Sequence, residues 1–167
     1  MLIKCNPGTI KDIKDSFKKY ASNPKIIQDK WNKEFSEEID KVIDDLLIDT
    51  VKPFSPIMEM IQKVSINAFS NLKSSENKLI LFSDMLHNTN ELSFYKTIPS
   101  FKQFSKTSYF SKIRTDLEKN VSVEICQVRR DNNEYIQNSK EFKIFWTQYL
   151  VNGLRAKRDL KYYDCEG

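Results

Sequence analysis

The sequence predicts an α/β domain in which helices pack against a mostly parallel sheet. Residues 78–83 and 121–128 are short apolar runs with the length of strands. Helical spacing of apolar residues marks segments before and after them, which begin near Pro24, Ile57 and Ser139. Such alternation is typical of a layered α/β fold. The chain has only 3 glycines and 5 prolines, which argues against a sandwich or barrel with many tight turns.

The N-terminal part predicts a short strand and a long helix. Residues 2–5 have the composition of a strand, and the proline and glycine in 6–9 indicate a turn after it. Asn23 is a suitable N-cap, and Pro24 is a suitable first helical residue. The apolar residues expected on the buried side of this helix are Ile27, Trp31, Phe35, Ile39, Val42 and Leu46.

A second helix is expected directly after Ser55 and Pro56, because a hydroxyl cap followed by proline is a common helix start. Residues 73–77 then form the loop that leads to the strand 78–83. The buried stripe of this helix would consist of Ile57, Ile61, Val64, Ala68 and Leu72.

The strand 78–83 is followed at once by polar residues. Its uninterrupted apolar run suggests a strand buried on both faces of a parallel sheet. In open α/β sheets, ligands bind outside the carboxyl ends of the strands, which is where Ser83 and Asp84 would lie. Aspartate is also a common turn residue, so a purely structural role of Asp84 stays open.

The C-terminal half adds a second strand and a last helix. Within residues 91–120, only 113–119 has a plain helical pattern. The strand 121–128 alternates, which suggests that one of its faces is less deeply buried than in 78–83. A helix is predicted over 139–152 with Gly153 at its end, and 160–163 is expected to be a closing edge strand.

Size and charge exclude some classes of function. A chain of 167 residues is one domain by length. The net charge of +4 and the pI near 8.8 are well below those of a dedicated nucleic-acid binder. No apolar segment is long enough to cross a bilayer, and residues 1–6 lack the layout of a signal peptide. We therefore expect a cytoplasmic protein with no membrane partner.

The cysteines and the single histidine contribute little to a metal or redox site. Cys5, Cys126 and Cys165 are an odd number without close spacing, which predicts neither a disulfide framework nor a zinc site. Since His87 is the only histidine, any metal would be a hard cation held by oxygen. The chain has no phosphate-cradling glycine loop, nucleophile elbow or cysteine–histidine pair, so we expect no catalytic activity.

Two segments together resemble von Willebrand factor A-like (VWA) domains. Residues 55–61, Ser-Pro-Ile-Met-Glu-Met-Ile, are similar to the threonine-proline-leucine helix start of that family, and residues 79–84, Leu-Ile-Leu-Phe-Ser-Asp, resemble its fourth strand. A late helix similar to that of bacterial members contains Phe145, Trp146, Tyr149 and Gly153. The resemblance implies a three-layer α/β/α, doubly wound, mostly parallel sheet within a single domain over 1–167.

The resemblance also implies a metal-ion-dependent adhesion site for Mg²⁺. In this family the ion is held by an Asp-x-Ser-x-Ser motif after the first strand, a threonine, and an aspartate after the fourth strand. A carboxylate of a protein partner completes the coordination. Carried over, Ser55 takes the threonine position and Asp84 that of the last aspartate. Ser83 and His87, the latter expected in a surface loop, would lie near the partner.

The chain departs from the family pattern at its N-terminal end. It contains no Asp-x-Ser-x-Ser, and the sequence before Cys5 is too short for the first strands. We therefore expect an N-terminally truncated, partial VWA-like domain with an incomplete metal site. The strand 78–83 would then keep an unpaired edge, through which the chain could self-associate.

The leading hypothesis is a non-catalytic protein-interaction module, and two other functions stay open. Asp84 at a strand end resembles the phosphoacceptor of receiver domains, although the acidic pair Asp44 and Asp45 lies within a predicted helix. Aromatic residues and lysines are interleaved in 94–112, which suits single-stranded nucleic acid. The sequence favours a simpler interpretation of 94–112, in which most of the aromatic side chains belong to the core and the lysines face water.

Overall fold

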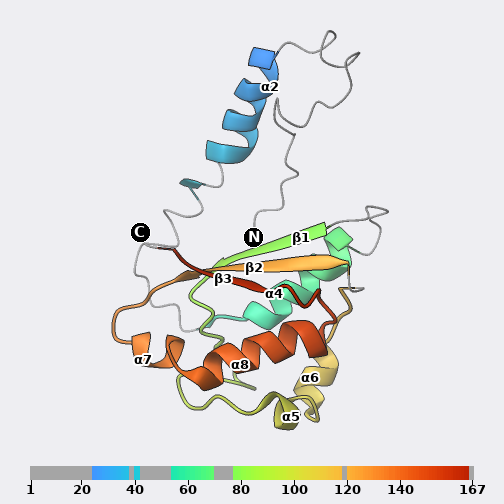
Figure 1. Cartoon of the computed structure of the whole chain (residues 1–167). Helices are drawn as coiled ribbons and strands as arrows, with labels where there is room; N and C mark the ends of the chain where they lie inside the picture. The colour runs from blue at the N-terminus through green and yellow to red at the C-terminus, as the bar shows by residue number, and fades with distance from the viewer. Residues whose placement is uncertain (1–23, 38–39, 42–53, 70–76, 118–119, 166–167) are drawn as a thin grey trace. The chain divides into compact units, whose positions relative to one another are not determined.

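The computed structural model describes residues 24–37, 40–41, 54–69, 77–117 and 120–165 (Figure 1). The chain divides into two compact units, Met1–Ile48 and Asp49–Gly167. The predicted strand over 2–5 lies outside the described residues, and the single domain over 1–167 stays a prediction.

In the first unit the described residues form a helix. Helix α2 covers Pro24–Trp31 and continues into a π-helical turn, Asn32–Ser36. The helix begins at Pro24, as predicted from the fixed φ angle of proline. The expected buried residues Val42 and Leu46 lie outside the described residues.

The second unit contains the sheet and the remaining described helices. Before the sheet comes α4 (Ile57–Val64), extended by a π-helical turn (Ser65–Phe69). The strands are β1 (Asn77–Ser83), β2 (Val121–Val128) and β3 (Lys161–Cys165). The helices between the strands are α5 (Phe101–Phe104), α6 (Ser108–Ile113), α7 (Glu134–Gln137) and α8 (Lys140–Gln148), the last extended by a π-helical turn (Tyr149–Gly153).

The three strands are parallel and lie in the order β1-β2-β3, so β2 is central among them. Leu79 pairs with Val123, and Ile125 pairs with Tyr162. Helices α5 to α8 lie on one side of these strands (Figure 1). Right-handed crossovers between neighbouring strands taken in sequence order place every connecting helix on the same face. The predicted α/β fold with a parallel sheet is confirmed at this level.

The core lies between the helices and one face of the sheet. Leu79, Val123 and Ile125 point into it from the strands. A cluster of aromatic rings packs edge to face beneath them. This packing buries apolar area and places the positive edge of one ring against the negative face of the next. Its members are Phe94, Phe104, Phe110, Phe142, Phe145, Trp146 and Tyr149.

The expected order of burial between the two long strands is wrong. In β2 most residues are buried, whereas in β1 Lys78 and Ile80 are exposed. The reason is position in the sheet, because β2 lies between two strands while β1 pairs only with β2 among the described residues. The apolar content of a segment therefore does not predict whether its strand lies at the centre or at the edge of the sheet.

One expected helix and one expected helix cap are also wrong, although α4 begins at Ile57, directly after Ser55 and Pro56, as predicted. Residues 114–117 are not helical, and the helix lies earlier, in α6, where the Thr107 side chain accepts a hydrogen bond from the Phe110 amide. Ser55 does not cap α4, since no side-chain cap bond is present there. Its backbone instead exchanges two hydrogen bonds with that of Asn88.

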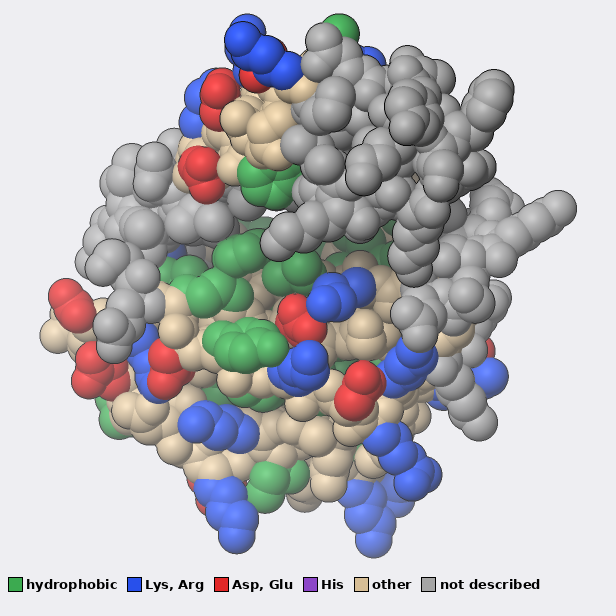
Figure 2. Space-filling model, turned by 45° about the horizontal axis from the view of Figure 1, so that its top comes forward, with side chains coloured by type: hydrophobic (Ala, Val, Ile, Leu, Met, Phe, Trp, Pro, Cys, Tyr) green, Lys and Arg blue, Asp and Glu red, His purple; other side chains and the backbone are tan. Residues whose placement is uncertain are grey.

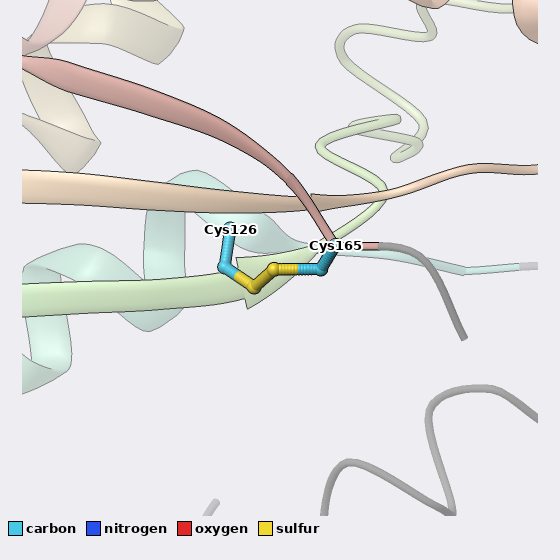
Figure 3. The surroundings of a disulfide bond; sticks show 2 residues. All are labelled: Cys126 and Cys165. Atoms are coloured by element: carbon cyan, nitrogen blue, oxygen red, sulfur yellow. A yellow bond between two sulfur atoms is a disulfide. The ribbon is translucent and has the colours of Figure 1, made fainter.

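Cys126 and Cys165 form a disulfide between β2 and β3 (Figure 3). The expectation of no disulfide is therefore wrong. The two cysteines are 39 residues apart in sequence, but their Cα atoms are 5.4 Å apart. The register explains this, because Cys165 pairs with Val128, two residues along the same face of β2 from Cys126.

None of the helices in the described part of the chain has the length and apolar character that crossing a bilayer requires.

Candidate functional site

The carboxyl ends of the strands place several charged side chains along one edge of the sheet, as expected for parallel strands. Asp84 follows β1, Arg129 and Arg130 follow β2, and Asp164 lies near the end of β3. Arg129 donates from Nη2 to Asp164 Oδ1 at 2.7 Å. The sheet edge is thus crossed by ion pairs between consecutive strands.

Asp84 is already bound by its neighbours. Its Oδ1 accepts a hydrogen bond from the Leu86 amide at 3.0 Å, and its Oδ2 accepts from Arg130 Nε at 3.1 Å. Gln137, which is fully buried, donates from Nε2 to the carbonyls of Asp84 and Val128 at 2.9 Å each. These contacts tie the loop after β1 to the loop after β2.

Ser83 and Ser55 lie in the same region as Asp84. Ser83 Oγ accepts a hydrogen bond from the Met85 amide at 3.0 Å, where the backbone has a positive φ of 59°. The Ser55 amide donates to the Asn88 carbonyl at 2.8 Å, and the Asn88 amide donates back to the Ser55 carbonyl at 2.9 Å. The structure therefore brings the segment before α4 against the loop that follows β1.

The magnesium site expected from the sequence would use Ser55 and Asp84. No group of three or more histidine, cysteine, aspartate or glutamate side chains that could hold a metal occurs within the described ranges. Asp84 shares its carboxylate with a guanidinium, which opposes the approach of a second cation. Ser55 and Asp84 as metal ligands, and Asp84 as a phosphoacceptor, stay predictions.

His87 is fully buried, so the expectation that it lies in a surface loop is wrong. Its Nε2 lies 2.9 Å from Tyr109 Oη, and Tyr109 Oη donates to Glu59 Oε1 at 2.6 Å. Because the tyrosine proton is used on Glu59, the His87 proton belongs on Nε2. The contact of His87 with a partner, expected from the sequence, would require this loop to open.

Burial controls the protonation of this group of side chains. Desolvation lowers the pKa of His87 to about 4, so the ring is neutral at neutral pH. Burial and the hydrogen bond to Glu59 raise the pKa of Tyr109. His87 Nδ1 and Glu59 Oε2 are buried without a hydrogen-bond partner in the structure. No sequence signal marks this cluster, because Glu59 and Tyr109 are 50 residues apart.

The face of the sheet opposite the core carries a second set of side chains, which we call the open face. It consists of Lys78, Ile80, Phe82, Glu124, Lys161 and Tyr163. Alternation along the strands points these residues away from Leu79, Val123 and Tyr162, which belong to the core. Ile80 is 48% exposed and Tyr163 is 47% exposed. Figure 2 shows hydrophobic side chains gathered beside acidic and basic ones on the side of the molecule that it turns forward.

The charged side chains of the open face meet at Glu124, with one lysine from each neighbouring strand. Lys78 Nζ lies 3.0 Å and Lys161 Nζ 3.4 Å from the same oxygen, Glu124 Oε1. The hydrogen bond from Lys78, followed by that from Lys161, lowers the pKa of Glu124. Two ammonium groups share one carboxylate, which leaves an excess of one positive charge.

The segment 94–112 supports the interpretation that most of its aromatic residues belong to the core, although Tyr95 is exposed. Its buried aromatic side chains are Phe94, Phe104, Tyr109 and Phe110. Its lysines, in contrast, are exposed: Lys96, Lys102, Lys106 and Lys112. Rings that pack inside the protein are not free to stack on bases. Binding to nucleic acid stays a prediction that this arrangement does not favour.

No protein-family model matches this chain, and neither a curated protein nor a solved structure matches it.

Proposed function

We propose that this chain is a non-catalytic protein-interaction module and that its binding surface is the open face. The observation that carries the proposal is the exposure of large apolar side chains, Ile80 and Tyr163, on one face of a parallel sheet. Parallel sheets are nearly always covered on both faces. A face of this kind is a favourable place for a partner to bind.

The three-layer, VWA-like arrangement belongs to the same proposal. Sequential strand order with all connecting helices on one side is the arrangement of one half of a doubly wound sheet. In a complete doubly wound sheet, the other half supplies helices for the opposite face. The resemblance of residues 55–61 and 79–84 to VWA segments supports this assignment.

The charged edge after the strands is a weaker candidate for the binding surface. A partner that coordinated a cation through Asp84 would first have to displace Arg130 from the carboxylate. Since both side chains are largely buried, at 18% and 17% exposed, that exchange would expose two charges that now satisfy each other. The open face requires no such exchange.

A paired set of variants tests the proposal. Ile80→Gln with Tyr163→Ser removes the apolar groups of the open face. Ile144→Gln with Tyr135→Ser makes the same two replacements at exposed positions on α8 and α7, where Tyr135 is 73% exposed. We expect a protein cross-linked to the wild-type chain in cells to be retained by the control pair and lost by the open-face pair.

Circular dichroism of both double variants is the check that the fold is intact. If the cross-linked protein is retained by the open-face pair as strongly as by the control pair, the open face is not the binding surface and the proposal fails.

A further inference from the structure

Strand β3 is fixed to β2 at both of its ends. Before the strand, the Lys157 amide donates a hydrogen bond to the carbonyl of Val121, the first residue of β2, at 2.9 Å. At the last residue of β3, Cys165 is bonded to Cys126 of β2 (Figure 3). While both connections are intact, β3 cannot peel away from β2 from either end. The disulfide is the one of the two that a change of redox state removes.

The contacts of β3 between these two ends are weak. Lys161, Tyr163 and Asp164 are exposed. Ion pairs of exposed side chains, such as those of Lys161 and Asp164, contribute little to stability. Tyr162 packs against the core, but its Oη is buried without a hydrogen-bond partner among the described residues, which costs free energy. Apart from the disulfide, β3 is therefore held mainly by its backbone hydrogen bonds to β2.

The disulfide lies where a dissolved reductant can reach it. Cys126 and Cys165 alternate in phase with Glu124 and Tyr163, so their side chains lie on the open-face side of the sheet. Helices α5 to α8 lie on the other side (Figure 1). Cys165 is partly exposed, whereas Cys126 is 7% exposed. Exposed disulfides are the ones that exchange readily with thiols, and the Cys165 sulfur is the more open to attack.

We propose that the Cys126–Cys165 disulfide is a reversible redox switch that a dithiol reductant opens, and that its opening releases β3 from β2. A thiolate of the dithiol attacks Cys165 Sγ, the bond between the two sulfurs breaks, and Cys126 leaves as a thiolate that takes a proton from water. The second thiolate of the dithiol then attacks the mixed disulfide and expels Cys165, which is protonated in turn. Two electrons pass to the cysteine pair, and the dithiol becomes a disulfide.

Release of β3 changes the sheet at β2. The backbone of Glu124–Val128, which now pairs with β3, would become a sheet edge with unpaired amides and carbonyls. Tyr163 and Lys161 would leave the open face together with the strand. The redox state of one bond thus determines whether β2 is central among the described strands or lies at their edge.

Hydrogen exchange measured by mass spectrometry tests the switch in the full chain. Peptide mapping first verifies that the oxidised chain contains the Cys126–Cys165 bond, and dithiothreitol serves as the dithiol. A hydrogen-bonded amide exchanges when its strand opens. We expect exchange of the amides in Lys161–Cys165 to become roughly tenfold faster or more on reduction, because the tether across 39 residues of sequence is lost. Exchange in α8 should stay unchanged, and reoxidation should restore the protection of β3.

Matched cysteine variants locate the effect. Cys126→Ser with Cys165→Ser should show fast exchange of β3 without any reductant and no response to dithiothreitol. Cys5→Ser removes the cysteine that lies outside the described residues and keeps the pair, so it should respond as the wild-type chain does.

Four outcomes overturn the inference. Mapping that finds no Cys126–Cys165 bond in the oxidised chain removes the switch. Equal protection of β3 in the reduced and oxidised chains shows that the bond does not control the strand. Exchange that accelerates in α8 as much as in β3 shows that the bond holds the whole fold, which is a structural role. Protection that does not return on reoxidation shows that the change is not reversible. The experiment uses no partner protein, so none of these results decides the proposed function.

Discussion

The two faces of the three-stranded sheet carry similar kinds of residues in different surroundings. Leu79, Val123 and Ile125 point to the helices and join one core with the aromatic cluster. Ile80 follows Leu79 on β1 and Tyr163 lies on β3, and both point to the opposite face, where they are about half exposed. Strand alternation thus divides these strands into residues that hold the fold and residues that lie exposed.

The largest expected effect lies on the covered face. Trp146 is fully buried and donates from Nε1 to the Met85 carbonyl at 3.1 Å. Trp146→Ala leaves a cavity and removes one of the two hydrogen bonds that the Met85 carbonyl accepts, so we expect a loss of about 3–5 kcal/mol in the free energy of unfolding, measured with urea. Ile144→Ala on the same helix is the exposed control and should cost under about 1 kcal/mol. Similar losses for the two would contradict the division between faces.

The second largest effect is a dependence of stability on pH, which comes from the buried imidazole ring of His87. The pKa of His87 is lowered from 6.5 to about 4, so between these values the unfolded chain binds a proton that the folded chain does not. Stability should therefore be unaffected by this group above about pH 6.5 and should fall by about 3 kcal/mol as the pH drops toward 4.

Because the chain has 1 histidine, its NMR titration reports this pKa directly. His87→Gln can still hydrogen-bond to Tyr109 and is the control. Its stability should change with pH only through the carboxylates, without the loss that His87 causes. An ordinary pKa near 6.5 in the folded chain would show that the ring is open to water.

A medium effect is expected where the loops after β1 and β2 meet. Asp84→Ala removes a carboxylate that pairs with Arg130 and accepts from the Leu86 amide, which should cost about 1–3 kcal/mol of unfolding free energy. Asp84→Asn keeps an acceptor for the Leu86 amide but loses the ion pair with Arg130. Comparing it with Asp84→Ala therefore measures the turn hydrogen bond and the ion pair separately. Asp164→Ala, at a more exposed pair with Arg129, should cost under about 1 kcal/mol. If Asp84→Ala weakens partner binding with no change in stability, Asp84 serves the partner and not the fold.

The smallest effect on stability is expected on the open face. Ile80→Ala removes methyl groups that are already half in water, so we expect a loss under about 1 kcal/mol in urea unfolding. Leu79→Ala, the neighbouring residue on the covered face, should cost about 2–4 kcal/mol. Equal losses for these adjacent positions would show that the open face is as tightly packed as the core.

Local sequence determines much of the fold because its signals act over a few residues. The predicted strand 121–128 has the observed bounds, and 78–83 differs from β1 by one residue. Ser139 accepts a hydrogen bond from the Phe142 amide at the start of α8, as a serine N-cap should. The region 91–120 was poorly predicted, because α5 and α6 are short helices whose aromatic residues follow the core and not a helical period.

The candidate sites were less accessible to sequence reasoning. Ser83 and Asp84 do lie at the carboxyl end of a parallel strand, which follows from the strand prediction alone. The partner of Asp84 is Arg130, 46 residues away, and nothing in the spacing indicates it. The open face was not predicted either, since it depends on the side from which the helices approach.

By itself the sequence determined the strands, the helix from Ser139 and the parallel α/β class, because apolar spacing and caps act within a few residues. Tertiary structure alone decided that β2 is central, that Cys126 meets Cys165, and that His87 is buried against Tyr109. It also decided which face of the sheet the described helices leave uncovered. These features depend on contacts between segments tens of residues apart, and the chain must fold before such contacts exist.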